Sequence, residues 1–213
     1  MLGPYFITTL ETDVCLHPKH MNNNIMDNIK NNLIKQHLNK CFNDYGYIDK
    51  IYNIYDDIKG GIIRAEDNTA SSTYSVRFRC RICKPIKNSI IYAKITGINN
   101  VIIIAENGPI KFLIDSSNIN SNNIKFIRSA YYPVSANGEI INQVIQKGTY
   151  VMVKVMNKKI VRNKSVIIAI STLESVISDN DVQELIRKQY EQQEEVEPEI
   201  LLNNNDVDDS TVE

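Results

Sequence analysis

The sequence lacks the short motifs that mark most enzyme families. It contains no G-x-G-x-x-G, no Walker phosphate loop, no G-x-S-x-G and no H-E-x-x-H segment. No stretch approaches the ~20 apolar residues that a membrane-spanning helix needs. The start, MLGPYFITTLETD, has neither a basic n-region nor a long apolar run, so we expect no secretory signal. Signals for an enzyme, a membrane protein or a secreted protein are therefore poor.

Cysteine and histidine are scarce, and their spacing does not complete a metal site. The four cysteines are Cys15, Cys41, Cys80 and Cys83. Without a secretory signal they predict free thiols in a reducing compartment. Cys80 and Cys83 have C-x-x-C spacing, but a zinc site needs further ligands and usually a tight turn. His17 and His20 also lack further ligands, so we predict no metal, no cofactor and no catalytic residue.

The segment TYSVRFRCRICKP, residues 73–85, alternates as a half-buried β-strand does. Its apolar face carries Tyr74, Val76, Phe78, Cys80 and Ile82, and its other face carries Arg77, Arg79, Arg81 and Cys83. Cys80 and Cys83 then point in opposite directions and cannot bind one metal ion. We expect Cys80 in the core and Cys83 at the edge. The arginine row could contact an acidic partner, contact phosphate, or simply be solvated.

The net charge of −1 conceals a strong asymmetry along the chain. Residues 179–213 hold 12 of the 25 acidic residues and 2 of the 24 basic ones, a net charge of −10, which leaves +9 on residues 1–178. A basic body with an acidic tail is typical of a body that binds an anionic partner, although the tail could merely solubilise and shield the body. We expect a helix over residues 179–195 that packs on the body or a neighbouring subunit, then a disordered tail.

The first part of the chain, residues 1–84, predicts a small α+β domain. Apolar residues such as Ile25, Ile29 and Leu33 recur at steps of three and four and predict one amphipathic helix. DDIKGG, residues 56–61, predicts a turn. The expected elements are strands at 12–16, 46–55, 62–65 and 74–83 and a helix at 21–42.

The second part, residues 85–178, predicts an all-β barrel. Lys84-Pro85 interrupts the preceding strand, because proline cannot donate to a β-ladder. Five strands follow, at 89–96, 101–105, 110–114, 148–156 and 160–171. With a tight Asn107-Gly108 turn, this series predicts a small closed barrel such as an OB-fold. Residues 131–148 remain unassigned.

Basic residues gather around the expected turn at 157–159, between the last two strands. They are Lys154, Lys158, Lys159, Arg162 and Lys164. OB-folds bind single strands through such loops, and lysines there would bind RNA phosphates in a salt-dependent way. The alternative is a solvated hairpin tip. Candidate stacking aromatics are Tyr92, Phe112, Tyr131 and Tyr132, and each could equally belong to the core.

The order of the motifs along the chain resembles that of one family. The motifs are TDVCLHP, a long amphipathic helix, YGYIDKIYNI, GGIIRAED, TYSVRFRCRICKP and ENGPIKFLI. The chain is similar to the seventh subunit of eukaryotic RNA polymerase II and its counterpart in the archaeal RNA polymerase, over about residues 5–171. The resemblance implies a tip domain that docks on the polymerase core and an OB domain that contacts RNA. It also implies a stalk shared with a smaller partner subunit, and no catalytic activity of its own.

The resemblance assigns core docking to the end of the first strand, the turn at 56–61 and the strand after that turn. These positions are His17, Pro18, Asp56, Asp57, Lys59, Gly60, Gly61 and Arg64. The implied partners are the large polymerase subunits, the small stalk partner and nascent RNA, with no membrane. The 34 isoleucines and 26 asparagines against 10 leucines indicate an AT-rich genome. With the acidic tail, this suggests a large DNA virus, hence the infected cell's cytoplasm and the virion; a cellular version would be nuclear.

Two other functions remain open from the residues alone. One is a free OB-fold RNA-binding protein, for example a translational one, with the first domain as an accessory. The other is a nuclease or other enzyme on an OB scaffold. Co-purification with large polymerase subunits would separate the free protein from the polymerase subunit.

Overall fold

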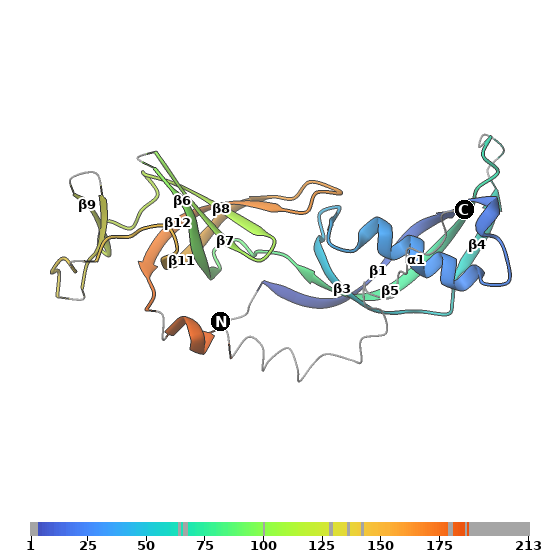
Figure 1. Cartoon of the computed structure of the whole chain (residues 1–213), viewed down its shortest axis with the longest axis horizontal. Helices are drawn as coiled ribbons and strands as arrows, with labels where there is room; N and C mark the ends of the chain where they lie inside the picture. Colours follow the sequence, from blue (N-terminus) through green and yellow to red (C-terminus); the bar gives the residue numbers. More distant parts are fainter. Residues whose placement is uncertain are drawn as a thin grey trace, which may run out of the picture.

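The computed structural model describes residues 4–185 and 187, except 64, 66, 67, 100, 128, 129, 136, 142, 179 and 180. Figure 1 shows an elongated molecule with a helix-covered sheet towards one end and a β-barrel towards the other. The expected fold class, an α+β tip domain followed by an OB-like barrel, is confirmed. Of the expected helix at 179–195, residues 181–185 are helical. The rest of that helix, apart from Arg187, and the acidic tail lie outside the described residues.

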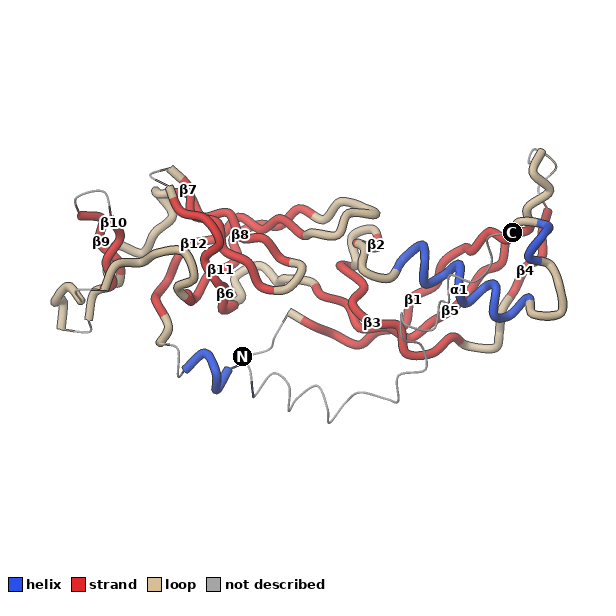
Figure 2. Tube along the Cα trace, in the orientation of Figure 1, coloured by secondary structure: helices blue, strands red, loops and turns tan. Residues whose placement is uncertain are grey.

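The tip sheet is antiparallel and has five strands. They are β1 (Tyr5–Leu16), β2 (Cys41–Phe42), β3 (Gly46–Ile54), β4 (Lys59–Ile63) and β5 (Ser72–Cys83), in the spatial order β1-β5-β3-β2 with β4 pairing β5. The turn η1 (Pro18–His20) precedes the helix α1 (Ile25–His37), as Figure 2 shows. Ile29 and Leu33 of α1 are buried in one cluster with Val76, Phe78 and Cys80 of β5. The alternation expected for β5 is therefore confirmed, and α1 covers its apolar face.

Several boundaries in the tip domain differ from the sequence-based expectation. β1 begins at Tyr5 rather than at residue 12, since it pairs with β5 along its whole length. The helix ends at His37 rather than 42, because Leu38 is extended, with ψ 139°, and Asn39 has φ 60°. The last turn expected for the helix instead supplies β2.

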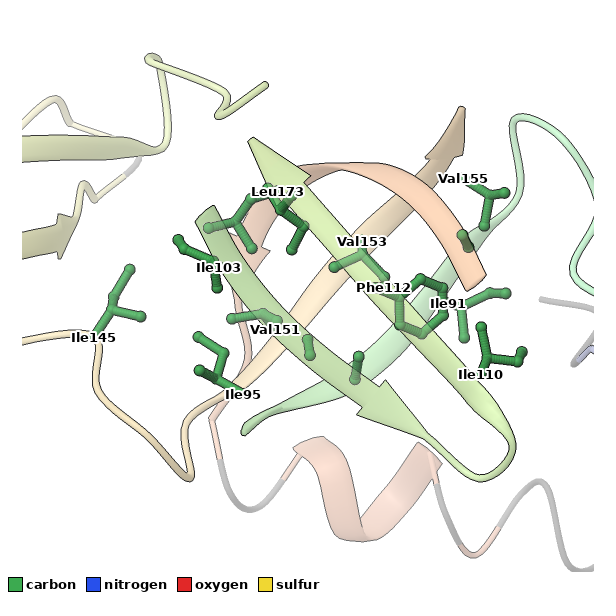
Figure 3. Packing of buried hydrophobic residues seen from close by; sticks show 14 of the residues in the cluster. Ile91, Ile95, Ile103, Ile110, Phe112, Ile145, Val151, Val153, Val155 and Leu173 are labelled. Carbon is green, nitrogen blue, oxygen red and sulfur yellow. The ribbon is translucent and has the colours of Figure 1, made fainter. Parts of the chain in front are cut away.

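The second half of the chain closes into a five-stranded barrel. Its strands are β6 (Ile90–Ile98), β7 (Ile102–Asn107), β8 (Ile110–Asp115), β11 (Tyr150–Lys159) and β12 (Ile167–Val176), and β11 pairs with both β12 and β6. Alternate residues such as Phe112, Val151 and Val153 fill the interior in Figure 3. β9 (Ile124–Ile127) and β10 (Ala130–Pro133), which the sequence did not predict, form a separate hairpin.

The last hairpin corrects the expected turn at 157–159. β11 continues to Lys159 and β12 begins at Ile167, so the connection is residues 160–166. This loop extends from the barrel toward β2 in Figure 2. There the Cys41 N–H donates to the Lys164 carbonyl at 2.7 Å, and the Asn163 N–H donates to the Cys41 carbonyl at 3.0 Å. The loop is thus hydrogen-bonded to β2 and connects the barrel to the tip domain.

β5 joins the two hydrophobic cores. Cys80 belongs to the tip cluster, whereas Cys83 belongs to the barrel cluster, against which Tyr5 and Tyr47 also pack. The opposite orientation expected for the two thiols is confirmed, but the edge position expected for Cys83 is wrong, since it is 0% exposed. Burial raises the pKa of Cys80 to about 12 and also raises the pKa of Cys83. Both thiols are therefore protonated at neutral pH.

The arginine row on the other face of β5 is largely neutralised by ion pairs within the chain. Arg81 donates from Nε to Asp49 Oδ2 at 2.7 Å and also from Nη2. Arg77 pairs with Asp57, with 2.6 Å between Nη2 and Oδ2. Because two of the three arginines neutralise carboxylates of the same chain, this row is not a free phosphate-binding strip.

Close packing where the domains meet requires glycine at position 46. Its φ is +139°, and a Cβ there would lie 2.5 Å from the Cys83 carbonyl oxygen. That oxygen belongs to the backbone of β5 and cannot rotate away.

We predict that Gly46→Ala destabilises the protein by about 2–5 kcal/mol, since backbone strain and a steric clash act together. The midpoint of urea denaturation, followed by circular dichroism, measures the effect. Gly138→Ala is the matched control, because Gly138 also has positive φ but no atom within 4 Å of the added Cβ. Equal effects of the two substitutions would contradict the close contact.

Candidate docking and RNA-contact surfaces

Most of the residues expected to dock on a polymerase core gather at the far end of the tip sheet. Ser72 of β5 pairs with Leu16 on one side and with Ile63 on the other. The end of β1, with His17 and Pro18 just beyond it, therefore lies beside the end of β4. Figure 1 places this end of the molecule away from the barrel.

The individual residues at this end differ in whether their side chains are paired within the chain. His17, Pro18, Asp56, Lys59, Gly60 and Gly61 are exposed. Asp57 is also exposed, but its carboxylate pairs with Arg77, whose guanidinium lies 4.8 Å from the Tyr55 ring centroid. Arg64 lies outside the described residues.

β4 is an exposed edge strand with two large apolar side chains. All five of its residues are exposed; Ile62 is 66% exposed and Ile63 is 56% exposed. Within the described chain β4 pairs only with β5, so its outer edge presents unpaired backbone groups. Gly60 permits this pairing, since a Cβ there would lie 2.4 Å from the Thr73 carbonyl oxygen. An exposed apolar edge of this kind is a candidate protein-docking surface.

Ile62 and Ile63 were missed as docking residues. The sequence predicted a turn at 56–61 and a strand at 62–65, whereas β4 already begins at Lys59 and ends at Ile63. A short run of isoleucines is ordinarily taken for a buried strand. The folded structure shows that both side chains are largely exposed. The alternation of polar and apolar residues carries no information about which strand lies at an edge.

The basic hairpin divides into a structural and an exposed part. Lys158 donates through Nζ to the Pro85 carbonyl oxygen, and burial together with nearby Lys84 lowers its pKa. Lys154 is half-buried on β11. Lys159, Arg162 and Lys164 are exposed. The exposed cations of the expected RNA site are thus Lys159 at the end of β11 and Arg162 and Lys164 on the following loop. Lys158 instead holds β11 against the start of the barrel.

The expected stacking aromatics are mostly core residues. Phe112 is 0% exposed inside the barrel. Tyr131 is 5% exposed and packs on Phe126, with 4.7 Å between the ring centroids. Tyr92 and Tyr132 are half-buried. Phe112 and Tyr131 therefore follow the alternative interpretation, in which the aromatic side chain serves packing.

The described part of the chain contains no helix long and apolar enough to cross a bilayer. Over the same residues, no three or more His, Cys, Asp or Glu side chains come together as a metal-binding group.

Comparison with known proteins identifies the chain's relatives. Residues 11–67 match the family described as "SHS2 domain found in N terminus of Rpb7p/Rpc25p/MJ0397". A protein of Acanthamoeba polyphaga mimivirus named "Putative DNA-directed RNA polymerase subunit" is 30% identical over 209 residues, 96% of this chain and 94% of that protein. DNA-directed RNA polymerase II subunit RPB7 of Glycine max is 30% identical over 112 residues, 53% of this chain and 62% of its own length. Subunit rpb7 of Schizosaccharomyces pombe is 27% identical over 172 residues, 80% of this chain and 95% of its own.

The fold and these relatives together define the class: homologues of subunits of DNA-directed RNA polymerases. Within that class the chain belongs to the Rpb7 family, as the order of its sequence motifs indicated.

Proposed function

We propose that this protein is the non-catalytic stalk subunit of a multisubunit RNA polymerase. Residues 1–84 dock on the polymerase core, residues 85–178 contact emerging RNA, and residues 179–213 form an acidic extension. The observation that carries the proposal is the exposed apolar edge of β4, which adjoins the exposed His17 and Pro18 at the end of the tip domain remote from the barrel. Docking would cover Ile62 and Ile63 and leave the barrel projecting from the core.

The proposed partners are the large polymerase subunits, a small stalk subunit and nascent RNA. The similarity to a mimivirus protein over 96% of the chain supports a viral polymerase. Such an enzyme would act in the cytoplasm of the infected cell and be carried in the virion, whereas a cellular counterpart would act in the nucleus.

A free OB-fold RNA-binding protein is the second candidate. Both functions use the exposed cations of the 160–166 loop and its flanks. Docking on a protein such as the polymerase core accounts for the apolar β4 edge, whereas a free RNA-binding protein would leave Ile62 and Ile63 exposed to water for no gain.

We predict that Ile62→Asp with Ile63→Asp abolishes recovery of the two largest polymerase subunits when the tagged protein is isolated at moderate salt. Burying either aspartate in an apolar interface would require its desolvation. The readout is mass spectrometry of the recovered proteins. Val101→Asp is the matched control, since Val101 is 67% exposed on the barrel. If wild-type protein recovers RNA or ribosomal proteins without those subunits, the stalk function is wrong.

We also predict that exchanging the three exposed cations of the hairpin, Lys159, Arg162 and Lys164, for glutamine weakens binding of single-stranded RNA. Each lost phosphate contact should flatten the dependence of log K on log salt by about 0.7. Fluorescence anisotropy at several salt concentrations measures the slope. A triple variant with the wild-type slope would show that these side chains are merely solvated.

A further inference from the structure

The outer face of β6 and β11 carries lysines next to an aromatic ring. Val151 and Val153 point into the barrel, so Tyr150, Met152 and Lys154 point outward. Across the β6 pairing, Tyr150 lies opposite Lys94 and Lys154 lies opposite Ile90. The Lys94 ammonium lies 5.3 Å from the Tyr150 ring centroid, a cation–π contact that fixes the ring at the surface.

The neighbouring outer face, on β7 and β8, offers nothing comparable. Its centre is apolar, with Ile104 opposite Leu113. Its one cation there, Lys111, forms a 3.1 Å ion pair with Glu106. Neither strand has an aromatic side chain on this face. The outer face of β7 and β8 therefore offers a nucleic acid no aromatic ring for base stacking and no unpaired cation for its phosphates.

A polar cleft opens at the Tyr150 end of the β6–β11 face. Its volume is about 760 Å³, and its walls include Gln143, Gln146, Lys147, Thr149 and Tyr150. This volume is in the range of small-molecule sites, roughly 300–1,000 Å³. Gln143 and Gln146 are exposed, and side-chain amides both donate and accept hydrogen bonds, as the edges of bases do. Tyr150 therefore both contacts a lysine and lines a cleft that is large enough to admit a base.

We propose that single-stranded RNA runs along this β6–β11 face, with Lys94 and Lys154 on its phosphates and a base stacked on Tyr150. The adjacent nucleotide enters the cleft, where Gln143 and Gln146 hydrogen-bond to its base edge. From Tyr150 to Lys154 the strand covers about 13 Å at ~3.3 Å per residue, the length of roughly four stacked nucleotides. The proposal rests on the RNA contact proposed above and assigns it to a particular face.

This face is separable from the loop between β11 and β12. The loop binds to β2 of the tip domain, whereas the cleft is lined by Pro133 at the end of β10 and by the end of β12. Lys154 lies on the strand that connects the two regions, so variants of Lys94 and Tyr150 test this face alone.

The test is fluorescence anisotropy of the full-length protein with a labelled single-stranded RNA of about 12 nucleotides, within the usual size range for one OB-fold. Tyr150→Leu should weaken binding about 5- to 150-fold, the equivalent of losing one base stack. Tyr150→Phe should retain wild-type affinity, because it keeps the ring. Lys94→Gln should flatten the salt slope by about 0.7. Tyr45→Leu and Lys19→Gln, exposed residues of the tip domain, are the matched controls and should change nothing.

The possible failures have different meanings. If wild-type protein binds the RNA but only the loop variants weaken binding, this face is not the site, while RNA contact by the barrel stands. If Tyr150→Phe weakens binding as much as Tyr150→Leu does, the ring is not a stacking surface and the assignment is wrong. If wild-type protein does not bind the RNA even at low salt, both the assignment and the proposed RNA contact fail.

Discussion

The structure depends on one strand that serves two hydrophobic cores. β5 places Cys80 under the helix of the tip domain and, further along the strand, Cys83 inside the barrel. At this point Arg81 and Asp49 form an ion pair whose side chains are only 11% and 26% exposed. Removing one partner of such a pair leaves an uncompensated charge, so the pair constrains how β5 and β3 can move relative to each other. The junction is therefore a packed and hydrogen-bonded region between the two cores.

The loop between β11 and β12 provides a second connection, remote in sequence from the first. It adds backbone hydrogen bonds at Cys41, and burial there lowers the pKa of His37, with Arg162 of the loop and Lys40 adding to the effect. His37 is also in edge-to-face contact with Phe42, with 5.1 Å between ring centroids. The shared strand β5 and this loop therefore hold the tip domain and the barrel in a fixed relative orientation. The apolar edge of β4 then lies at one end of the molecule, and the barrel face with Lys94 and Tyr150 lies toward the other end.

The sequence was informative wherever one face of an element is buried and the other is wet. The alternation in β5 predicted its faces and the divergence of its two thiols, and the three-four spacing of α1 predicted a helix. The burial of Cys83 could not be predicted, because it comes from the barrel, a part of the chain that packs on β5 only after folding. The 160–166 loop was assigned to a strand for the same reason: its backbone partner, Cys41, lies far away in sequence.

The candidate surfaces were harder to predict than the fold. Ile62 and Ile63 have the composition of a buried strand, yet all of β4 is exposed in the structure. The cluster of basic residues in the sequence predicted RNA contact by Lys158, but its ammonium donates to the Pro85 carbonyl oxygen. Lys94 and Tyr150 are far apart in sequence and are brought together only by the register of β6 with β11. The local sequence thus predicted where charged residues lie along the chain, but not which residues they contact in the fold.

The most direct test of this fixed orientation is a spin-label distance measurement between the tip domain and the barrel. Cys15 is exposed and the other cysteines, Cys41, Cys80 and Cys83, are buried, so Cys15 can be labelled selectively. Ile168→Cys adds a second site on the outer face of β12, where Ile168 is 40% exposed. Two domains fixed by the shared strand and the loop predict a single narrow distance distribution in solution. A broad distribution, or two separated populations, would contradict the account.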